Sequence, residues 1–146
     1  LPFDWKTFDD LTGMKLGGGL KYSYGPDFDA FLAKGKVRME RVSSDQQNFE
    51  KLLKERVVLY SQEMNVGYAA LRSHFSPEDQ AKITHHPKPL LVNLSYLMLP
   101  KSLEGSPALL DRFNKRLQRY RDSGRYQRYF DDLQQGKYQP EPSATP

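Results

Sequence analysis

The sequence predicts an α/β fold built on a mainly parallel sheet. Short β-prone runs alternate along the chain with stretches whose apolar residues recur every three or four positions, as expected for alternating strands and helices. One run, VVLY at 57–60, is continuously β-prone, which is typical of a strand buried on both faces of a parallel sheet. Of the 146 residues, 38% are hydrophobic and 27% are charged, a balance that indicates a folded globular chain.

Composition excludes several classes of protein. The chain contains no cysteine, which rules out a disulfide framework and thiol catalysis and leaves the redox compartment open. No apolar run approaches the length of a membrane span, so we expect a soluble chain. The first ten residues, LPFDWKTFDD, lack the basic and apolar regions of a signal peptide. The compartment stays undecided at this point, because a mature chain would look the same.

The net charge of +4 is concentrated towards the C-terminus, where much of the excess of arginine and lysine lies between Arg112 and Arg128. Tyrosines are interleaved with these basic residues, a pattern that nucleic-acid-binding proteins also show. The apolar residues of the same stretch have helical spacing, however, so a solvated charged helix face is the better interpretation. We therefore expect no nucleic acid among the partners.

The chain opens with apolar residues at three-residue spacing, Trp5, Phe8 and Leu11, and a turn signal at Thr12–Gly13 ends this pattern. Residues 14–19 then predict a short strand that runs into glycines.

The most informative stretch of the sequence begins with the glycines at the end of this strand. Gly17–Gly19 are expected to form a glycine-rich loop in which the backbone turns sharply and approaches a ligand closely. Pro26 and Asp27 are helix-start signals, and the helix is expected to run to about Lys34, with Gly35 as its stop. A helix N-terminus suits an anion, but a plain strand-to-helix connection explains the same residues equally well. The spacing fits neither a P-loop nor a dinucleotide-binding fingerprint.

A second strand and a capped helix follow. Alternation over Val37–Val42, VRMERV, predicts the strand. Ser44 and Gln47 have the spacing of a capping box, which predicts that a helix begins directly after Ser44.

Polar residues follow the buried strand VVLY, and they are the first candidates for ligand binding. Gln62 and Glu63 come just after it, and open α/β sheets bind ligands outside the carboxyl ends of their strands. A carboxylate there can accept an ammonium group. The alternative is that Glu63 only stabilises the first turn of the helix predicted after it.

Histidines are few, and their spacing does not indicate a metal site. His85 and His86 are adjacent, so they do not share a helix face, and His74 is separate in sequence. We expect all three on the surface or in loops, and no metal. Just after His74, Ser76 and Pro77 predict another helix start.

The C-terminal third predicts one more strand region and two helices. Leu90–Leu99 is the longest apolar run and is expected to form one or two strand segments that Pro100 ends. Ser106–Pro107 is expected to cap a long helix, Ser123–Gly124 to break it, and an aromatic-rich helix to follow. From Lys137 the proline-rich sequence predicts an extended or disordered tail.

Four phrases, taken in order, carry a family resemblance that covers most of the chain. They are FDDLTGMKLGGGLKYSYG, SSDQQNFEKLLKERVVLYSQEMNVGYAAL, LSYLMLPKS and LLDRFNKRLQRYRDSGRYQRYFDDL. Together they resemble bacterial extracellular solute-binding protein family 3, the periplasmic substrate-binding proteins of amino-acid ABC transporters. The resemblance implies a type II periplasmic-binding fold, in which two three-layer α/β lobes are joined by crossing strands and hold ligand in the cleft between them.

The resemblance also implies how the chain divides. Residues 1–89 are expected to form lobe two, 90–136 the return crossing and the C-terminal part of lobe one, and 137–146 a flexible tail. The N-terminal half of lobe one is expected to be missing, and with it the arginine that usually grips a ligand carboxylate. The incomplete lobe would leave apolar helices and a strand edge uncovered, so we expect a homodimer through it.

In the resembled family the wall of lobe two is lined by the loop that here reads KYSYG, and an acidic residue at the position of Glu63 takes the ligand's ammonium group. Two departures bear on this transfer: many relatives have a Gly-Ser/Thr-Thr pattern in that loop, and Val58 stands where they often have aspartate. The expected ligand-binding residues are Lys21, Tyr22, Ser23, Tyr24, Gln62 and Glu63.

The function that the resemblance implies is that of a periplasmic solute-binding protein, which binds an amino acid or similar small polar solute and presents it to a membrane permease. It requires no cofactor and is not an enzyme. One alternative is an enzyme on the same fold with Glu63 as general acid or base, although the sequence offers no evident second group. Another is a ligand-sensing module of a signalling receptor.

Overall fold

The computed structural model describes residues 3–138, so most of the tail expected at 137–146 lies outside the described residues. The chain divides into two compact units, Leu1–Val92 (unit 1) and Asn93–Pro146 (unit 2), where the resemblance led us to expect a division after residue 89. Strands and helices alternate along unit 1, which confirms the α/β class.

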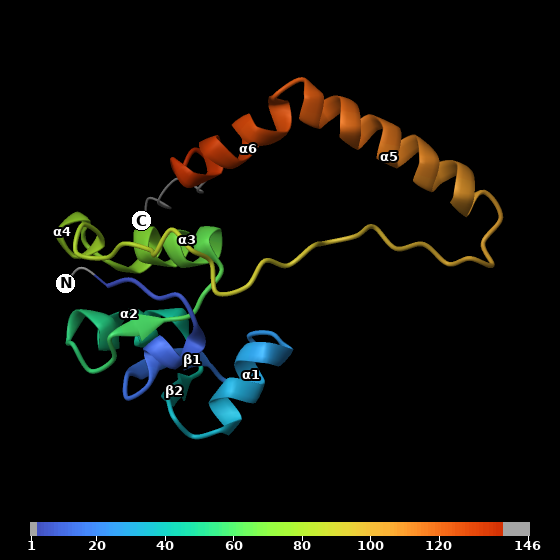
Figure 1. Ribbon diagram of the computed structural model, residues 1–146. Helices are drawn as coiled ribbons and strands as arrows, with labels where there is room; N and C mark the ends of the chain where they lie inside the picture. Colours follow the sequence, from blue (N-terminus) through green and yellow to red (C-terminus); the bar gives the residue numbers. More distant parts are fainter. Residues whose placement is uncertain (1–2, 139–146) are drawn as a thin grey trace. The chain divides into compact units, whose positions relative to one another are not determined.

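Unit 1 is built on a three-stranded parallel sheet with β1 (Lys15–Gly19) in the middle. Its neighbours are β2 (Arg38–Val42) and β3 (Leu59–Tyr60), in the order β2-β1-β3. In register, Leu16 lies beside Met39 on one side and beside Leu59 on the other. Figure 1 shows β1 and β2 side by side in unit 1, with α1 and α2 nearby.

Gly17, Gly18 and Gly19 lie inside strand β1, so the expectation that they form a loop is wrong. They are small because side chains pack directly on the strand. A Cβ at Gly17 would lie 2.7 Å from Asn48 Oδ1, and one at Gly19 would lie 2.5 Å from the Tyr22 ring. The close approach that glycine permits here therefore serves side chains of the protein itself.

The hydrophobic core packs the first residues of the chain and α1 (Pro26–Ala33) against β1. Leu16 and Phe28 are among its most deeply buried side chains. The 3₁₀ turn η1 (Phe8–Leu11) contributes Phe8, whose ring centroid lies 5.1 Å from that of Phe28. Burying each such side chain contributes about 1.5–3 kcal/mol.

The helix α2 (Asp45–Leu53) begins where the sequence predicts, because the Ser44 hydroxyl accepts a hydrogen bond from the Gln47 N–H. The return half of the expected capping box is not made: the Gln47 side chain accepts from Ser43 instead. On the buried side of α2, the Phe49 ring packs edge-on against Tyr60 at 5.3 Å. Strand β3 is thereby held against α2.

Two further helices complete unit 1. Helix α3 (Met64–His74) packs against α2, and α4 (Pro77–Gln80) follows it after a short turn. The Ser76 hydroxyl accepts from the Asp79 N–H, which confirms the predicted cap.

The described part of unit 2, residues 93–138, contains two helices, α5 (Ser106–Asp122) and α6 (Arg125–Gln134). The predicted break between them is confirmed, and Gly124 makes it with a φ of +72°, a conformation that favours glycine. The start of α5 differs slightly from expectation. Gly105, with a φ of +82°, is the N-cap residue, and Ser106 is already helical.

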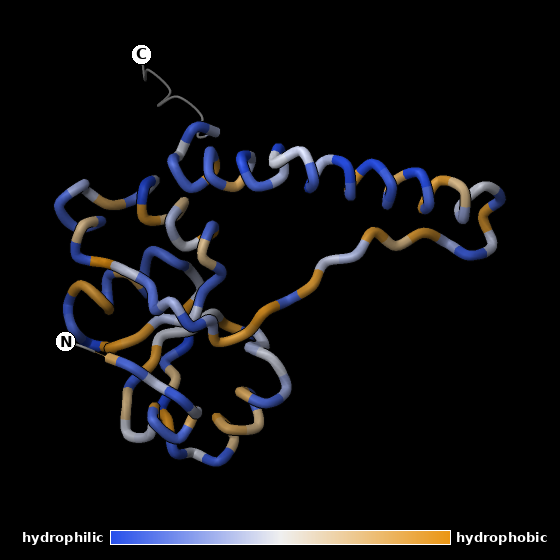
Figure 2. The backbone as a smooth tube through the Cα atoms, turned by 45° about the horizontal axis from the view of Figure 1, so that its top comes forward, coloured by the Kyte–Doolittle hydropathy of each residue, from blue (hydrophilic) through white to orange (hydrophobic). Residues whose placement is uncertain are grey.

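The strand expected at Leu90–Leu99 is absent, because residues 91–99 have no regular secondary structure. The described sheet consists of β1, β2 and β3, so this segment has no ladder partner that would make it a strand. Most of its apolar residues are exposed, and the exposed fraction of Met98 reaches 86%. Figure 2 shows the apolar residues along this segment and the mainly hydrophilic α5 and α6.

Candidate functional site

The strongest candidate site lies at the edge of the sheet where the three parallel strands end. Parallel strands bring the segments that follow them to one edge, and open α/β sheets bind ligands there. The loop 20–25 follows β1, Arg41 lies near the end of β2, and Gln62 and Glu63 follow β3. We call this region the carboxyl edge.

The loop after β1 is held in shape by an aspartate of α1. Asp29 accepts hydrogen bonds from the Ser23 hydroxyl at 2.5 Å and from the Tyr24 N–H at 3.1 Å. These two donors, Ser23 first, hold the pKa of Asp29 below its ordinary value of 3.8. The Ser23 hydroxyl thus donates to Asp29, although Ser23 itself is exposed to solvent.

Arg41 closes the same loop from the side of β2. Its Nη1 donates to the backbone oxygens of Gly19 at 2.9 Å and Tyr22 at 2.7 Å. The guanidinium carbon lies 5.4 Å from the centre of the Tyr24 ring, a favourable cation–π geometry. The Tyr24 hydroxyl in turn accepts from the Gly19 N–H at 2.7 Å. Since the guanidinium has five N–H donors, Arg41 keeps donors for a ligand.

These contacts leave an open groove of about 390 Å³ on the β2 side of the edge. It is lined by Lys21, Tyr22, Ser23, Asp29, Leu32 and Arg41. Three of the expected ligand-binding residues therefore line one groove. Its two cationic side chains, Lys21 and Arg41, outnumber its one carboxylate, Asp29, so this end of the edge has a net positive charge that can attract an anionic group.

A second polar cluster lies at the β3 end of the edge. The Tyr60 hydroxyl donates to Asp45 Oδ1 at 2.6 Å, and Gln62 Nε2 donates to the same oxygen at 2.7 Å. Partial burial, followed by the contact with Asp45, raises the pKa of Tyr60 well above its ordinary value. Tyr60 therefore stays protonated and serves as a hydrogen-bond donor.

Asn48 is a buried polar residue of α2 that packs against the glycines of β1. It is only 1% exposed, and its Nδ2 donates to the Gly18 oxygen at 3.1 Å. Its Oδ1 is buried and has no hydrogen-bond partner among the described residues. Such a buried polar group is costly, and Gly17 leaves it the room it needs.

Glu63 is exposed and acts as the N-cap of α3. Its carboxylate accepts from the Val66 N–H at 2.8 Å and from Asn65 Nδ2 at 3.1 Å. The sequence offered, as the alternative to ligand binding, a first-turn residue that interacts with the helix dipole, and the structure instead makes Glu63 the N-cap that precedes the first turn. A contact between this carboxylate and a ligand's ammonium group stays a prediction.

Five residues of the site were not identified from the sequence: Asp29, Arg41, Asp45, Asn48 and Tyr60. Arg41 contributed only to the alternating pattern VRMERV that predicts a strand, and Asp45 only to the start of the helix predicted after Ser44. Asn48 offered one usable signal, because it directly precedes Phe49, where apolar residues at helical spacing begin in the helix after Ser44. A polar residue at the border of an apolar face suggests a specific buried partner.

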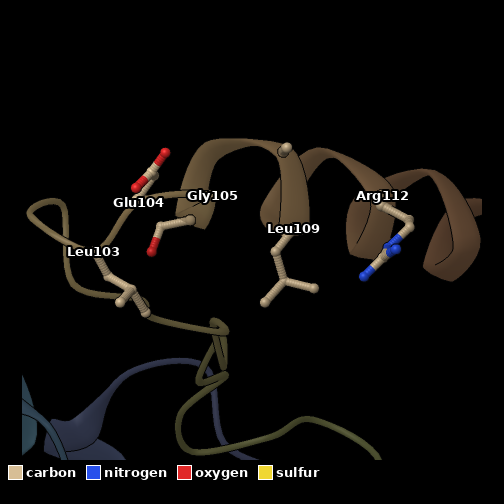
Figure 3. Close-up of a pocket in the computed structure, with 7 residues that line it drawn as sticks. Leu103, Glu104, Gly105, Leu109 and Arg112 are labelled. Atoms are coloured by element: carbon tan, nitrogen blue, oxygen red, sulfur yellow. The ribbon is translucent and has the colours of Figure 1, made fainter.

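Unit 2 has a separate hollow at the start of α5, which is a weaker candidate. The side chains of Leu103, Leu109 and Arg112 extend to one side there, and that of Glu104 points to the other (Figure 3). The helix offers few free donors, because the Ser106 N–H donates to the Leu103 oxygen and proline follows. Over residues 3–138, no group of three metal-binding side chains lies together.

Comparison with known proteins finds no match to a family model, to a curated protein or to a solved structure. Of the helices in residues 3–138, none combines the length and apolar character needed to cross a membrane.

Proposed function

We propose that the chain is part of a periplasmic solute-binding protein, with the carboxyl edge of unit 1 as one wall of the binding site. The ligand is an amino acid or a similar small zwitterion. The family resemblance supports this, and it implies a membrane permease of an ABC transporter as the partner that receives the ligand.

The observation that carries the proposal is the distribution of charge along the edge. Lys21 and Arg41 lie at the β2 end, where they outnumber the one carboxylate of that groove, Asp29, and Asp45 and Glu63 follow or flank β3. Neighbouring strands are about 4.8 Å apart, so the two ends are separated by about 10 Å before the long side chains reach inward. The two charged groups of an α-amino acid are bonded to one carbon atom, so the ligand bridges the two ends only when the Lys21 and Glu63 side chains both reach inward. Its carboxylate then faces the cationic end and its ammonium group the acidic end.

Titration calorimetry with each of the common L-amino acids tests the proposal. We expect at least one to bind, and its decarboxylated amine and its N-acetyl derivative each to bind at least about tenfold more weakly, since each loses one charged contact. If no amino acid binds, or if both analogues bind as well as the amino acid itself, the proposal is wrong.

Two substitutions assign the contacts. Ser23→Ala and Glu63→Gln should each weaken binding by about 1–3 kcal/mol, because the ligand covers both exposed groups and each substitution then removes a buried polar partner. Glutamine keeps an oxygen that can cap α3, so Glu63→Gln separates the loss of charge from the loss of the cap. The matched control is Glu50→Gln, which removes an exposed carboxylate from α2 and should leave affinity unchanged.

A further inference from the structure

Exposed apolar side chains gather at the carboxyl edge. Four large apolar residues there are between 38% and 58% exposed: Leu20, Tyr22, Met64 and Val66. The first two belong to the loop after β1, and the other two to the first turn of α3 after β3.

This gathering is specific to the edge. Leu91 adds to it, because its side chain packs against Gly25 of the loop after β1. In the rest of unit 1, as far as the structure describes it, the exposed large apolar side chains are Val58 and Val92. Single exposed apolar residues are ordinary, but several at the place where an open α/β sheet binds ligands indicate a binding surface.

The apolar residues bracket the charged ones in sequence. Leu20 and Tyr22 stand on either side of Lys21, and Met64 directly follows Glu63. The Tyr22 ring packs on the bare backbone of Gly19, where a Cβ would lie 2.5 Å from it. Apolar surface therefore adjoins the groups that would hold the two charges of a zwitterion.

We infer that the ligand is a zwitterion with an apolar side chain, aliphatic or aromatic, rather than a polar or charged one. The inference rests on the proposed function and names its ligand class. The charged groups of the ligand take Lys21 or Arg41 and Glu63, and its side chain covers Leu20, Tyr22 and Met64. Covering this surface removes apolar area from water on both partners, which favours binding.

Calorimetry with matched probes tests the inference. L-Leucine, L-methionine and L-phenylalanine should bind at least about tenfold more tightly than L-glutamine, L-lysine and L-glutamate, a difference of about 1.4 kcal/mol. If a polar or charged amino acid binds as tightly or more tightly, the inference is overturned while the proposed function stands. If none of the six binds and no other amino acid does, both are wrong.

Substitutions locate the preference. Leu20→Ser and Met64→Ser should each reduce the ratio of leucine to glutamine affinity by at least about threefold. The control is Val58→Ser, because Val58 is 57% exposed but precedes β3 and so lies at the opposite edge of the sheet. Circular dichroism of each variant confirms folding. An unchanged ratio in both edge variants, or an equal reduction in the control, contradicts the inference.

Discussion

Replacing Gly17 by alanine tests whether Asn48 packs against strand β1 as tightly as the structure indicates. The new Cβ would lie 2.7 Å from Asn48 Oδ1 and 3.5 Å from the Tyr60 ring. Asn48 has little freedom to withdraw, because it is buried and holds the Gly18 oxygen. Overpacking of this kind costs about 1–3 kcal/mol, part of which is the loss of the Asn48 hydrogen bond.

Urea denaturation measures this cost, with the fluorescence of the single tryptophan, Trp5, as the signal. The matched control is Gly67→Ala in α3, where the nearest atom to the new Cβ is Gln62 Cγ at an ordinary 3.5 Å. Alanine should stabilise that helix by up to about 1 kcal/mol. In an Asn48→Ala background the penalty of Gly17→Ala should fall below about 0.5 kcal/mol. A Gly17→Ala protein as stable as the wild type, or an equal penalty in both backgrounds, refutes this reasoning.

Three further predictions concern the loop, a helix end and the extended segment. The folded state lowers the pKa of Asp29, so its contact with Ser23 stabilises the fold above pH 3.8. This stabilisation is lost as the pH falls through the pKa that Asp29 has in the folded state. NMR titration of the Asp29 carboxyl measures that pKa, and a value at or above 3.8 would contradict the prediction. Gly35→Ala should lower the free energy of unfolding by about 1 kcal/mol, because Gly35 has a φ of +69°; thermal melting that matches the wild type would contradict this. We also propose that the exposed segment 93–99 pairs two copies of the chain, so sedimentation should show a dimer that Tyr96→Lys weakens, whereas a monomer at every concentration would exclude the pairing.

The local signals of the sequence account for much of unit 1. The caps at Ser44 and Ser76 depend on side chains that bond their own backbone, so their sequence spacing is sufficient to predict them. Strand β1 was also predictable, but the role of Gly17–Gly19 was not. Which side chains pack on a bare strand depends on contacts between residues distant in sequence, such as that of Asn48 with Gly18.

The same limit explains why the strand predicted at Leu90–Leu99 does not form. An apolar run predicts a strand only if another strand pairs with it, and nothing in the run itself supplies that partner. The site shows a related limit, because Arg41 acts through the backbone oxygens of Gly19 and Tyr22, which carry no sequence signal. By sequence Glu63 fits a ligand contact or a first-turn residue that interacts with the helix dipole, and the structure shows it as the N-cap, a local role that its position beside the helix start allows.

The most direct test of the central claim is to map the binding surface by NMR. Backbone amide shifts of the ¹⁵N-labelled chain are followed as L-leucine is added, with N-acetyl-leucine amide as the uncharged control. We expect saturable changes at Gly19–Tyr24, Arg41 and Gln62–Glu63, and none with the control. Changes confined to the hollow at the start of α5, or no saturable change with any amino acid, would contradict the assignment of the carboxyl edge as a binding site.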